Sequence, residues 1–333
     1  MINLDNKTIL ITGGTGSFGQ EFCKIILKKY KKIKKLIVFS RDELKQFNMS
    51  LQKDFLKNPK IRFFLGDVRD KDRLARAFDN VDIIIHAAAL KQVPTAEYNP
   101  TEFINTNVIG AQNIIEAAID KKVKQVIALS TDKAVAPINL YGATKLCSDK
   151  LFIAANDYAG GKVKFSIVRY GNVISSRGSV IPKFKEINQK SISESFPLTS
   201  YEMTRFLISL EDGVKTVLFA IDNQVGGEIY VPKMPSCKIV DLCKAINAKR
   251  KIKIVGLRPG EKMHEELIQN HDSSDTINIG KYYIILANNS KNNKNKIRKF
   301  FKKNYKIKNI SSFFSYNSKE NNFLNLNNLK SIL

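Results

Sequence analysis

Residues 7–19 read KTILITGGTGSFG, an apolar run rich in β-branched residues that ends in a glycine-rich turn. The run predicts a buried parallel strand over 7–12, and the helical spacing that follows predicts a helix over 18–30. Glycines in the pattern Gly14-x-Gly16-x-x-Gly19 at such a strand–turn–helix junction are typical of a dinucleotide site. They allow a sharp turn and a close approach to a pyrophosphate, which the N–H groups of the helix N-terminus can then bind.

The alternation of strands and helices continues along the chain. Further strands are expected over 36–39, 61–65, 81–86, 125–130 and 164–169, with helices over 70–78, 101–121 and 141–158. This order predicts an α/β fold with a doubly wound, mostly parallel Rossmann sheet and right-handed crossovers. Ligands of such sheets bind at the carboxyl ends of the strands, so the polar and glycine residues that follow each strand should meet at one edge.

Composition narrows the class of protein and its compartment. The start of the chain resembles no signal peptide, and no apolar run approaches the roughly 20 residues that cross a bilayer. Cys23, Cys147, Cys237 and Cys243 lack metal-ligand spacing. We therefore expect reduced thiols, no metal site and no membrane partner in a cytoplasmic protein.

The net charge of +24 is concentrated in Lys28–Lys35 and Lys291–Lys308. Such an excess can indicate binding to a polyanion, electrostatic steering of an anionic substrate, or a solvated lysine-rich surface. The Lys/Asn/Ile bias runs the length of the chain, as an AT-rich coding sequence produces. It favours the solvated surface, so no nucleic acid partner is expected.

The end of the second strand indicates which dinucleotide is bound. Enzymes that use NAD usually carry an Asp or Glu there, which binds the ribose 2′-hydroxyl. This chain has Phe39-Ser40-Arg41, with Lys45 one turn further on. Because Ser40, Arg41 and Lys45 would bind a 2′-phosphate, the sequence predicts NADP. Asp67-Val68 would flank the adenine, Ala87-Ala88 would line the dinucleotide, and His86 is expected to be a core histidine.

From about Gly171 the elements become shorter, more irregular and richer in proline. The predicted organisation is an NADP-binding Rossmann domain over 1–170 and a smaller substrate-binding subdomain over 171–285, from which segments return to the sheet. A basic polar C-terminal segment covers 286–333. Within it, Asn288–Asn309 is expected to be a mobile stretch or a surface helix, and the apolar spacing of Phe323–Leu333 suits docking onto the body.

The stretch with most chemistry is Ser130-Thr131-Asp132-Lys133, followed by Tyr141-Gly-Ala-Thr-Lys145. Tyrosine is a poor base at neutral pH because its ordinary pKa is about 10. Lys145 lies on the same helical face, and with the positive nicotinamide it would stabilise the Tyr141 phenolate, while Thr131 hydrogen-bonds the substrate hydroxyl. Asp132-Lys133 adds an acid and a base for eliminating water. A surface ion pair in a loop is the alternative, which the strand-end position disfavours.

Several segments between residue 8 and about residue 268 carry a family resemblance: ITGGTGSFG, FSRDELKQ, GDVRD, HAAALKQVP, ALSTDKAVAPINLYGATKLCSDKLF, VRYGNVISSRGSVIP, MTRF and RPGEKMHE. With them the chain resembles the extended short-chain dehydrogenases/reductases. Within these it resembles the inverting UDP-N-acetylglucosamine 4,6-dehydratases that begin pseudaminic acid synthesis. The region 286–320 resembles the family least.

The resemblance implies a mechanism. Tyr141, assisted by Thr131 and Lys145, removes the proton of the sugar O4 as hydride passes from C4 to NADP⁺. The 4-ketone acidifies C5, Lys133 is the base there, Asp132 is the acid for the C6 hydroxyl, and the hydride returns to C6. Reprotonation from the other face inverts C5. Related dehydratases use an Asp-Glu pair; here burial and the charges of Lys145 and the nicotinamide are expected to favour neutral Lys133.

The resemblance also implies binding residues and assembly into homo-oligomers, from dimers to hexamers. The substrate-binding set has cations for a diphosphate, a carboxylate for a ribose hydroxyl and a segment along the nucleotide: Lys91, Asn172, Arg205, Arg258, Glu261, Ile181, Pro182, Lys183, Phe184 and Lys185. The cofactor-binding set is Gly13, Gly14, Thr15, Gly16, Ser17, Phe18, Gly19, Ser40, Arg41, Asp42, Lys45, Asp67, Val68, Ala87, Ala88, Lys91, Tyr141, Lys145 and Val173.

Two other classes of function compete with this reading. One is another sugar-nucleotide enzyme on the same scaffold, either a capsule-type UDP-N-acetylglucosamine 4,6-dehydratase/5-epimerase or a 4-epimerase. An epimerase needs no acid–base pair beyond its tyrosine, so Asp132-Lys133 argues against it. Membrane-bound relatives have transmembrane helices and often Met in place of Tyr141, and this sequence shows neither feature. The other class is a non-catalytic NADP-binding sensor, which the intact Thr-Asp-Lys, Tyr and Lys set disfavours.

Overall fold

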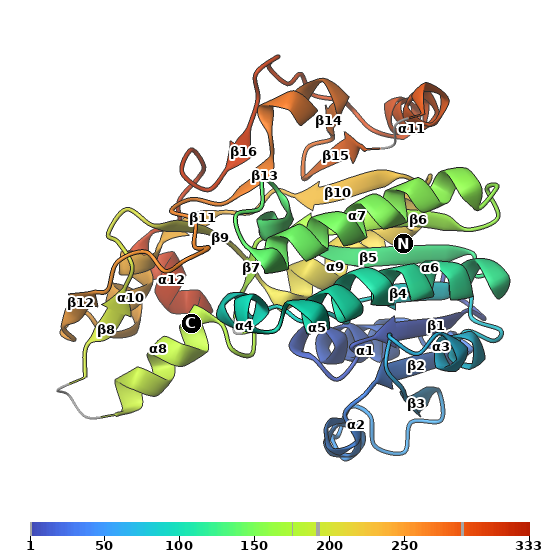
Figure 1. Ribbon diagram of the computed structural model, residues 1–333, viewed down its shortest axis with the longest axis horizontal. Helices are drawn as coiled ribbons and strands as arrows, with labels where there is room; N and C mark the ends of the chain where they lie inside the picture. The colour runs from blue at the N-terminus through green and yellow to red at the C-terminus, as the bar shows by residue number, and fades with distance from the viewer. Residues whose placement is uncertain (1, 175, 191–193, 288–289) are drawn as a thin grey trace.

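A nine-stranded sheet runs through the centre of the computed structural model, with helices on both faces (Figure 1). The structure describes residues 2–174, 176–190, 194–287 and 290–333. The strand order is β14-β15-β10-β6-β5-β4-β1-β2-β3. The predicted doubly wound α/β fold is confirmed.

Six strands from the N-terminal half form most of the parallel part of the sheet. They are β1 (Thr8–Thr12), β2 (Lys35–Ser40), β3 (Ile61–Leu65), β4 (Ile83–His86), β5 (Gln125–Thr131) and β6 (Lys164–Tyr170). Each lies where the sequence predicted a strand. Thr12 of β1 is paired with both Phe39 and His86, so the chain leaves these three strands at the same edge of the sheet.

Helices cover the two faces as the crossovers require. In Figure 1, α3 (Lys71–Ala77), α6 (Gly110–Asp120) and α7 (Leu140–Tyr158) lie in front of the sheet, with α1 (Ser17–Lys29) and α9 (Leu210–Asn223) behind it. The helix α2 (Glu43–Ser50) follows β2. The single helix predicted over 101–121 consists of α5 (Pro100–Ile104), a π-helical turn η1 (Asn105–Ile109) and α6.

Three strands from the C-terminal half return to the main sheet. The strand β10 (Glu228–Pro232) pairs parallel with β6, β15 (Tyr282–Leu286) pairs antiparallel with β10, and β14 (Thr276–Asn278) pairs antiparallel with β15. Their apolar side chains, such as Tyr230 and Ile284, belong to the same hydrophobic core as β1 and β4. These three strands therefore stabilise the main sheet.

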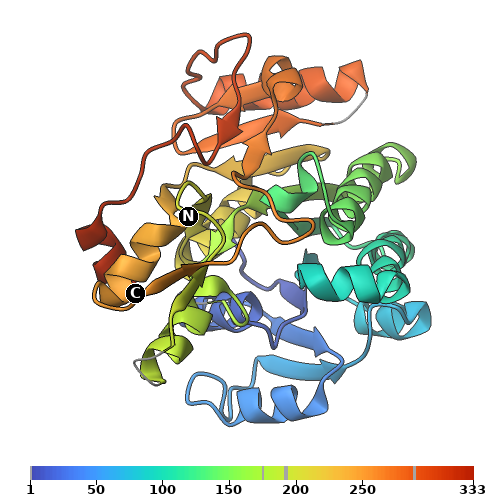
Figure 2. The same ribbon diagram turned by 60° about the vertical axis from the view of Figure 1, so that its left-hand side comes forward.

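A second hydrophobic core lies beside the sheet. It joins α8 (Val180–Gln189), α10 (Ile239–Asn247) and α12 (Leu326–Ile332) to β8 (Phe196–Leu198), β12 (Ile252–Ile254) and the sheet of β7 (Asn172–Val173), β9 (Thr204–Ile208) and β11 (Ser236–Lys238). Figure 2 shows α12, in red, against α10. Leu329 of α12 is fully buried there, so the end of the chain docks as its apolar spacing predicted.

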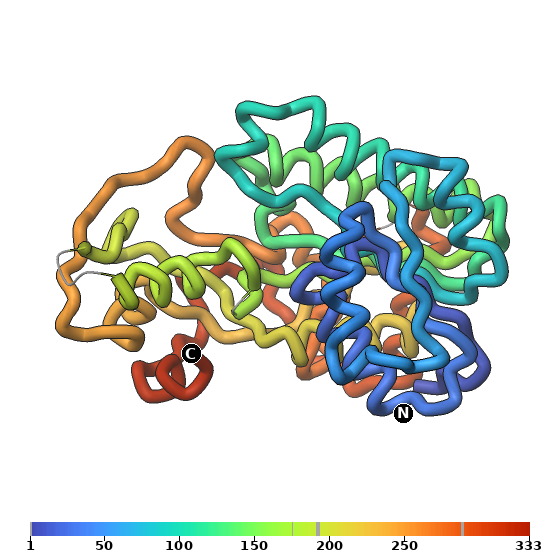
Figure 3. The backbone as a smooth tube through the Cα atoms, turned by 90° about the horizontal axis from the view of Figure 1, so that it is seen from below, coloured from blue at the N-terminus to red at the C-terminus, as the bar shows by residue number. Residues whose placement is uncertain are grey.

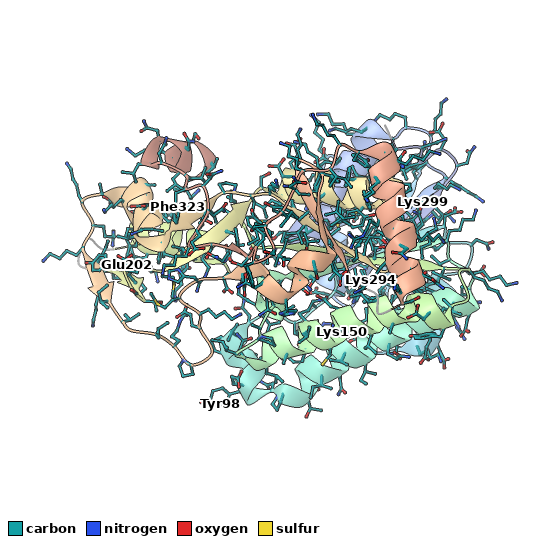
Figure 4. All side chains as sticks on the ribbon, turned by 90° about the horizontal axis from the view of Figure 1, so that it is seen from above. Tyr98, Lys150, Glu202, Lys294, Lys299 and Phe323 are labelled. Atoms are coloured by element: carbon teal, nitrogen blue, oxygen red, sulfur yellow. The ribbon has the colours of Figure 1, made fainter. Side chains whose placement is uncertain are left out.

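The lysine-rich part of the C-terminal segment forms a surface helix, α11 (Lys291–Asn304). Ile297 and Phe301 are buried on its inner face, and Figure 4 labels Lys294 and Lys299 on it. Residues 288 and 289 of the stretch expected to be mobile or helical lie outside the described residues. In the parts of the chain that are described, no helix combines the length and apolarity that crossing a membrane requires.

Candidate active site

The glycine-rich turn after β1 packs so closely that side chains cannot fit. A Cβ on Gly19 would lie 2.5 Å from Gly14 Cα, so glycine is required at position 19. Gly13 has φ +65° and would bring a Cβ within 2.9 Å of Ala88 Cα. The backbone therefore forms a narrow cradle in front of the N-terminus of α1. Such a cradle fits the pyrophosphate of a dinucleotide.

The rest of this turn is held by its neighbours. Thr15 O accepts a hydrogen bond from Gln20 Nε2 at 3.0 Å, and Ser17 Oγ accepts one from Arg177 N at 3.2 Å. The ring of Phe18 stacks on Tyr170 with 6.4 Å between centroids. The predicted cofactor turn thus touches the segment that follows β7.

At the tip of β2, the two predicted cations are each about half exposed and each lies near a carboxylate. Gln46 Nε2 donates to the backbone and side-chain oxygens of Ser40 at 2.9 and 3.0 Å. The Arg41 side chain is 53% exposed, 3.8 Å from an oxygen of Asp67. Asp42 caps α2 and also pairs with Lys45 Nζ at 2.7 Å. The Asp42 carboxylate therefore offsets the charge of Lys45, and Arg41 is the more available cation.

The residues that follow β3 and β4 lie at the same edge of the sheet as the glycine-rich turn. Burial raises the pKa of Asp67, but hydrogen bonds from Arg69 outweigh it and the pKa lies below its ordinary value. Val68 is buried against Gly110, since a Cβ added at Gly110 would lie 2.8 Å from Cγ2 of Val68. Ala87 N and Ala88 N donate to Thr12 O and Thr12 Oγ1 at 3.2 and 3.3 Å. The residues that follow β1, β2, β3 and β4 therefore contact the neighbouring strand ends along this edge.

His86 behaves as the core histidine that was expected. Its Nδ1 lies 2.9 Å from Thr12 Oγ1, and its ring packs against Phe152. Burial, with a smaller contribution from the charge of Lys145, lowers the pKa of His86 to about 3. It is therefore neutral at physiological pH.

The acid–base stretch lies where β5 passes into the short 3₁₀ turn η2 (Asp132–Ala134). Asp132 is fully buried, and its Oδ1 accepts from Thr131 Oγ1 at 2.9 Å and from Lys133 Nζ at 3.0 Å. Its Oδ2 is also buried and has no hydrogen-bond partner among the described residues. The pair lies at a strand end with its carboxylate fully buried and the Lys133 side chain 22% exposed, so it is not a solvated surface pair.

Tyr141 and Lys145 are buried one turn apart at the start of α7. Burial raises the pKa of Tyr141 to about 12, while the charge of Lys133 and a hydrogen bond with Thr131 act to lower it. Burial lowers the pKa of Lys145, and the carboxylate of Asp149 opposes this. Lys133 is thus the cation with the largest effect on the phenol, and the role of Lys145 toward Tyr141 stays a prediction.

The expectation that neighbouring positive charge keeps Lys133 neutral is wrong for the groups of this chain. Burial does lower the pKa of Lys133, but the carboxylates of Asp132 and Glu265 outweigh it and raise the pKa above its ordinary value. Glu265 Oε1 lies 3.3 Å from Lys133 Nζ. Lys133 therefore rests as an ammonium ion between two carboxylates.

The turn and the helix are pressed together at Gly142. A Cβ there would lie 2.2 Å from the carbonyl oxygen of Lys133. We expect Gly142→Ala to displace the turn, to lower the free energy of unfolding by about 1–3 kcal/mol and to reduce activity. Urea unfolding with turnover checks this. Gly213→Ala on α9 is the control, since its Cβ would meet Phe18 at an ordinary 3.6 Å; equal losses in both variants would contradict the prediction.

Arg205, predicted to bind a diphosphate, uses its donors inside the protein. Its Nη1 donates to Thr204 O at 2.7 Å and its Nη2 to Lys262 O at 2.8 Å. Its Nε lies 3.7 Å from Glu265 Oε1. The buried guanidinium thus fixes the loop over 261–265, and a contact with phosphate would require these donors to be released.

A loop that crosses between the two hydrophobic cores places Arg258 and Glu261 near η2, which is called the catalytic turn below because the resemblance assigns Asp132 and Lys133 to catalysis. Arg258 is 61% exposed and donates to Glu261 Oε1 at 2.7 Å. The loop is tied down by Asn139 Nδ2, which donates to Gly260 O at 2.7 Å, and by Lys262 Nζ, which donates to Val135 O at 2.6 Å. Figure 3 shows this orange loop reaching the teal part of the chain, where α4 (Val93–Tyr98) lies.

Lys91 and Asn172 belong to the predicted substrate-binding set, and Val173 belongs to the predicted cofactor-binding set. Lys91 Nζ donates to Arg177 O at 3.0 Å, and burial together with the charge of Lys133 lowers its pKa, so Lys91 lies near the catalytic turn. Asn172 Oδ1 is buried without a hydrogen-bond partner among the described residues, and Val173 pairs with Ile208. These residues stay at the edge of the site.

The segment predicted to lie along the nucleotide forms the start of α8. The side chains of Ile181 and Phe184 are buried in the second core, so contact of these two residues with a nucleotide would involve their backbone, and this role stays a prediction. The other three residues of the predicted segment are Pro182, Lys183 and Lys185. Of these, Lys185 donates a hydrogen bond from Nζ to the carbonyl oxygen of Leu333.

Three polar residues at the site were not predicted from the sequence. Asn107, in the π-helical turn, bonds both backbone groups of Leu90 at 2.9 Å and donates to Thr144 Oγ1 at 3.0 Å. Arg177 lies between the cofactor turn and Lys91, and Glu265 touches Lys133. The segments VRYGNVISSRGSVIP and RPGEKMHE contain Arg177 and Glu265, so a signal existed for these two; Asn107 had none.

A family model described as "Polysaccharide biosynthesis protein" matches residues 9–287. The chain belongs to this polysaccharide biosynthesis protein family. All the residues of the cofactor turn and the catalytic turn lie inside the matched range, whereas α11 and α12 lie beyond it.

The chain is also similar to named relatives and to a solved structure. A "UDP-N-acetylglucosamine 4,6-dehydratase (inverting)" of Campylobacter jejuni is 51% identical over 321 residues, covering 95% of this chain and 94% of the relative. A "UDP-glucose 4-epimerase" of Rickettsia bellii is 44% identical over 335 residues, covering 98% and 95%. The X-ray structure of Pen from Bacillus thuringiensis superposes with a TM-score of 0.86 at 34% identity, covering 99% and 98%.

Proposed function

We propose that this protein is an inverting UDP-N-acetylglucosamine 4,6-dehydratase that carries out the first step of pseudaminic acid synthesis. Its product would be UDP-2-acetamido-2,6-dideoxy-β-L-arabino-hex-4-ulose. The observation that carries the proposal is the buried pair at the end of β5, with Lys133 Nζ 3.0 Å from Asp132 Oδ1 and Tyr141 buried beside it. The name of the Campylobacter relative supports it.

In the first step Tyr141 accepts the proton of the sugar O4, and Thr131 hydrogen-bonds the same hydroxyl. Burial raises the pKa of the phenol, whereas the charge of Lys133 and the hydrogen bond with Thr131 favour its anion, and that anion is the form that accepts the O4 proton. A bound nicotinamide cofactor supplies a hydride acceptor for C4 and a hydride donor for C6. The glycine cradle before α1 would hold its pyrophosphate.

In the elimination step the C5 proton passes to Lys133 Nζ, and the C5–H electron pair enters the 4-ketone as an enolate. Asp132 gives a proton to the C6 hydroxyl, which leaves as water. The resting pair carries one proton, on Lys133, and moving it to Asp132 creates the acid and the base without a proton from outside. In water this transfer would cost about 9 kcal/mol from the ordinary pKa values. The raised pKa of Lys133 adds to that cost.

The proposed cofactor is NADP, since Arg41 is exposed next to Ser40 where a 2′-phosphate would lie. We expect Arg41→Asp to raise the dissociation constant of NADP by at least about tenfold and that of NAD far less, because a charged phosphate contact is lost. Titration calorimetry with both dinucleotides measures this. Arg76→Asp, at an exposed position of α3, is the control for the charge change. An equal loss for NAD and NADP would refute the assignment.

The function is tested by incubating the protein with UDP-N-acetylglucosamine in D₂O and analysing the products by NMR and mass spectrometry. We expect loss of one water, deuterium at an inverted C5 and no net reduced cofactor. An unchanged mass with a 4-epimer would refute the dehydratase. It would favour the epimerase activity that the name of the Rickettsia relative states.

We further propose that the enzyme is a homo-oligomer that works in the cytoplasm. The exposed apolar side chains of Ile104 and Ile109, on neighbouring helical turns, suit a contact between copies. The unpaired thiols of Cys23, Cys237 and Cys243 suit a reducing compartment. Analytical ultracentrifugation tests the assembly.

A further inference from the structure

Glu265 is a buried carboxylate to which the proposed mechanism gives no task. It is 2% exposed, and its Oε1 lies 3.3 Å from Lys133 Nζ and 3.7 Å from Arg205 Nε. Its Oε2 is buried and has no hydrogen-bond partner among the described residues. Burying a carboxylate is costly unless a cation compensates it, so its place beside Lys133 calls for a reason.

The backbone of Glu265 is fixed from both sides by a distant segment. Glu265 N donates to Ser318 Oγ at 2.9 Å, and Ser318 N donates to Glu265 O at 2.8 Å. Ser318 is fully buried, and its hydroxyl lies 2.7 Å from Thr204 Oγ1 on β9. Three segments thus meet to place one carboxylate against Lys133. Such a placement suits a group whose position matters to the reaction.

We infer that Glu265 is a positioning residue for Lys133: its carboxylate orients Lys133 Nζ and stabilises the ammonium ion that forms when Lys133 takes the proton from C5 of the sugar. This inference rests on the proposed dehydratase function. In the step, the C5–H bond breaks, an Nζ–H bond forms, and the electron pair enters the enolate. Glu265 stays ionised throughout and takes no proton.

Asp132 cannot fill this role at the same moment. As the acid for the C6 hydroxyl it must be protonated when elimination begins, so it carries no charge to stabilise a new ammonium ion. Glu265 carries its charge before and after the step, and Arg205 Nε faces it while Lys133 is neutral. The raised pKa of Lys133, to which Glu265 contributes, agrees with this pairing.

The pairing can be tested without substrate in the variant Glu265→Gln, which keeps the shape of the side chain and removes its charge. Lysine labelled with ¹³C at Cε reports the titration of Lys133 by NMR, and the signal missing in Lys133→Met assigns it. We expect the pKa of Lys133 to fall in Glu265→Gln and to be unchanged in the control Glu266→Gln, next in the chain. An unchanged pKa of Lys133 in Glu265→Gln would overturn the inference.

The second test follows the reaction with UDP-N-acetylglucosamine. We expect Glu265→Gln to slow water loss by about tenfold to a hundredfold, less than removing the base itself, while C4 oxidation keeps its rate. The rising limb of its pH profile should move to lower pH, and Glu265→Asp should restore part of the rate. Equal slowing of both steps, or an unmoved limb, would show a merely structural role and refute the inference. Wild-type protein that fails to dehydrate the sugar would refute the proposed function instead, and the titration would still decide the pairing.

Discussion

Tyr141→Phe is expected to abolish turnover of UDP-N-acetylglucosamine, because no other group is assigned to accept the O4 proton. The loss should be at least about 10²–10⁴-fold, the range for removal of a general base. Neither the ketone nor reduced cofactor should form, so elimination at C5 cannot start. Single-turnover absorbance of the reduced nicotinamide, followed by mass spectrometry of the sugar, measures both.

The variant keeps the buried ring of Tyr141, so the fold should be retained. Tyr158→Phe, at the exposed end of the same helix α7, provides a control with the same chemical change. Calorimetry should show that Tyr141→Phe still binds the nucleotide sugar. Reduced cofactor appearing at the wild-type rate in Tyr141→Phe would remove tyrosine from the mechanism.

Lys133→Met is expected to separate the two halves of the reaction. The apolar side chain has no lone pair that can accept the C5 proton, whereas Tyr141 can still oxidise C4. Reduced cofactor and a 4-keto sugar that keeps its C6 hydroxyl should therefore accumulate, and dehydration should fall by about 10²–10⁴-fold. Rapid-quench mass spectrometry distinguishes this intermediate from product.

Removing the Lys133 charge leaves Asp132 and Glu265 buried without it, which costs roughly 3–5 kcal/mol when a buried pair is broken. The double variant Lys133→Met, Glu265→Gln removes one of these carboxylate charges and should recover part of the stability. Lys150→Met changes an exposed lysine of α7, labelled in Figure 4, and should leave turnover unchanged. Normal dehydration by Lys133→Met would exclude Lys133 as the base.

Local sequence was sufficient to predict the parallel strands and the residues at their carboxyl ends. Their apolar runs and the glycines after them depend on near neighbours in the chain, as does the single helical turn between Tyr141 and Lys145. The amphipathic spacing of Ile181, Phe184 and Ile187 also indicated that these side chains form the buried face of a helix.

The ionisation of Lys133 could not be predicted in the same way. It depends on Glu265, which lies far along the chain and reaches Lys133 only because the loop over 261–265 folds back across the site. Lys145 is close by in the same motif and the nicotinamide carries a positive charge, so positive charge was expected to dominate. Contacts between distant segments decide such pKa values, and no local pattern records them.

The bonds between Ser318 and Glu265 have a consequence for the order in which the protein is made. The cofactor turn is complete once the first strands and helices of the sheet have left the ribosome, whereas Glu265 gains its anchor only when residue 318 has emerged. A partly translated chain, or one cut short before this serine, would hold a dinucleotide while its lysine lacked a fixed partner. We therefore expect a chain that lacks this serine to dehydrate the sugar more slowly than the full chain.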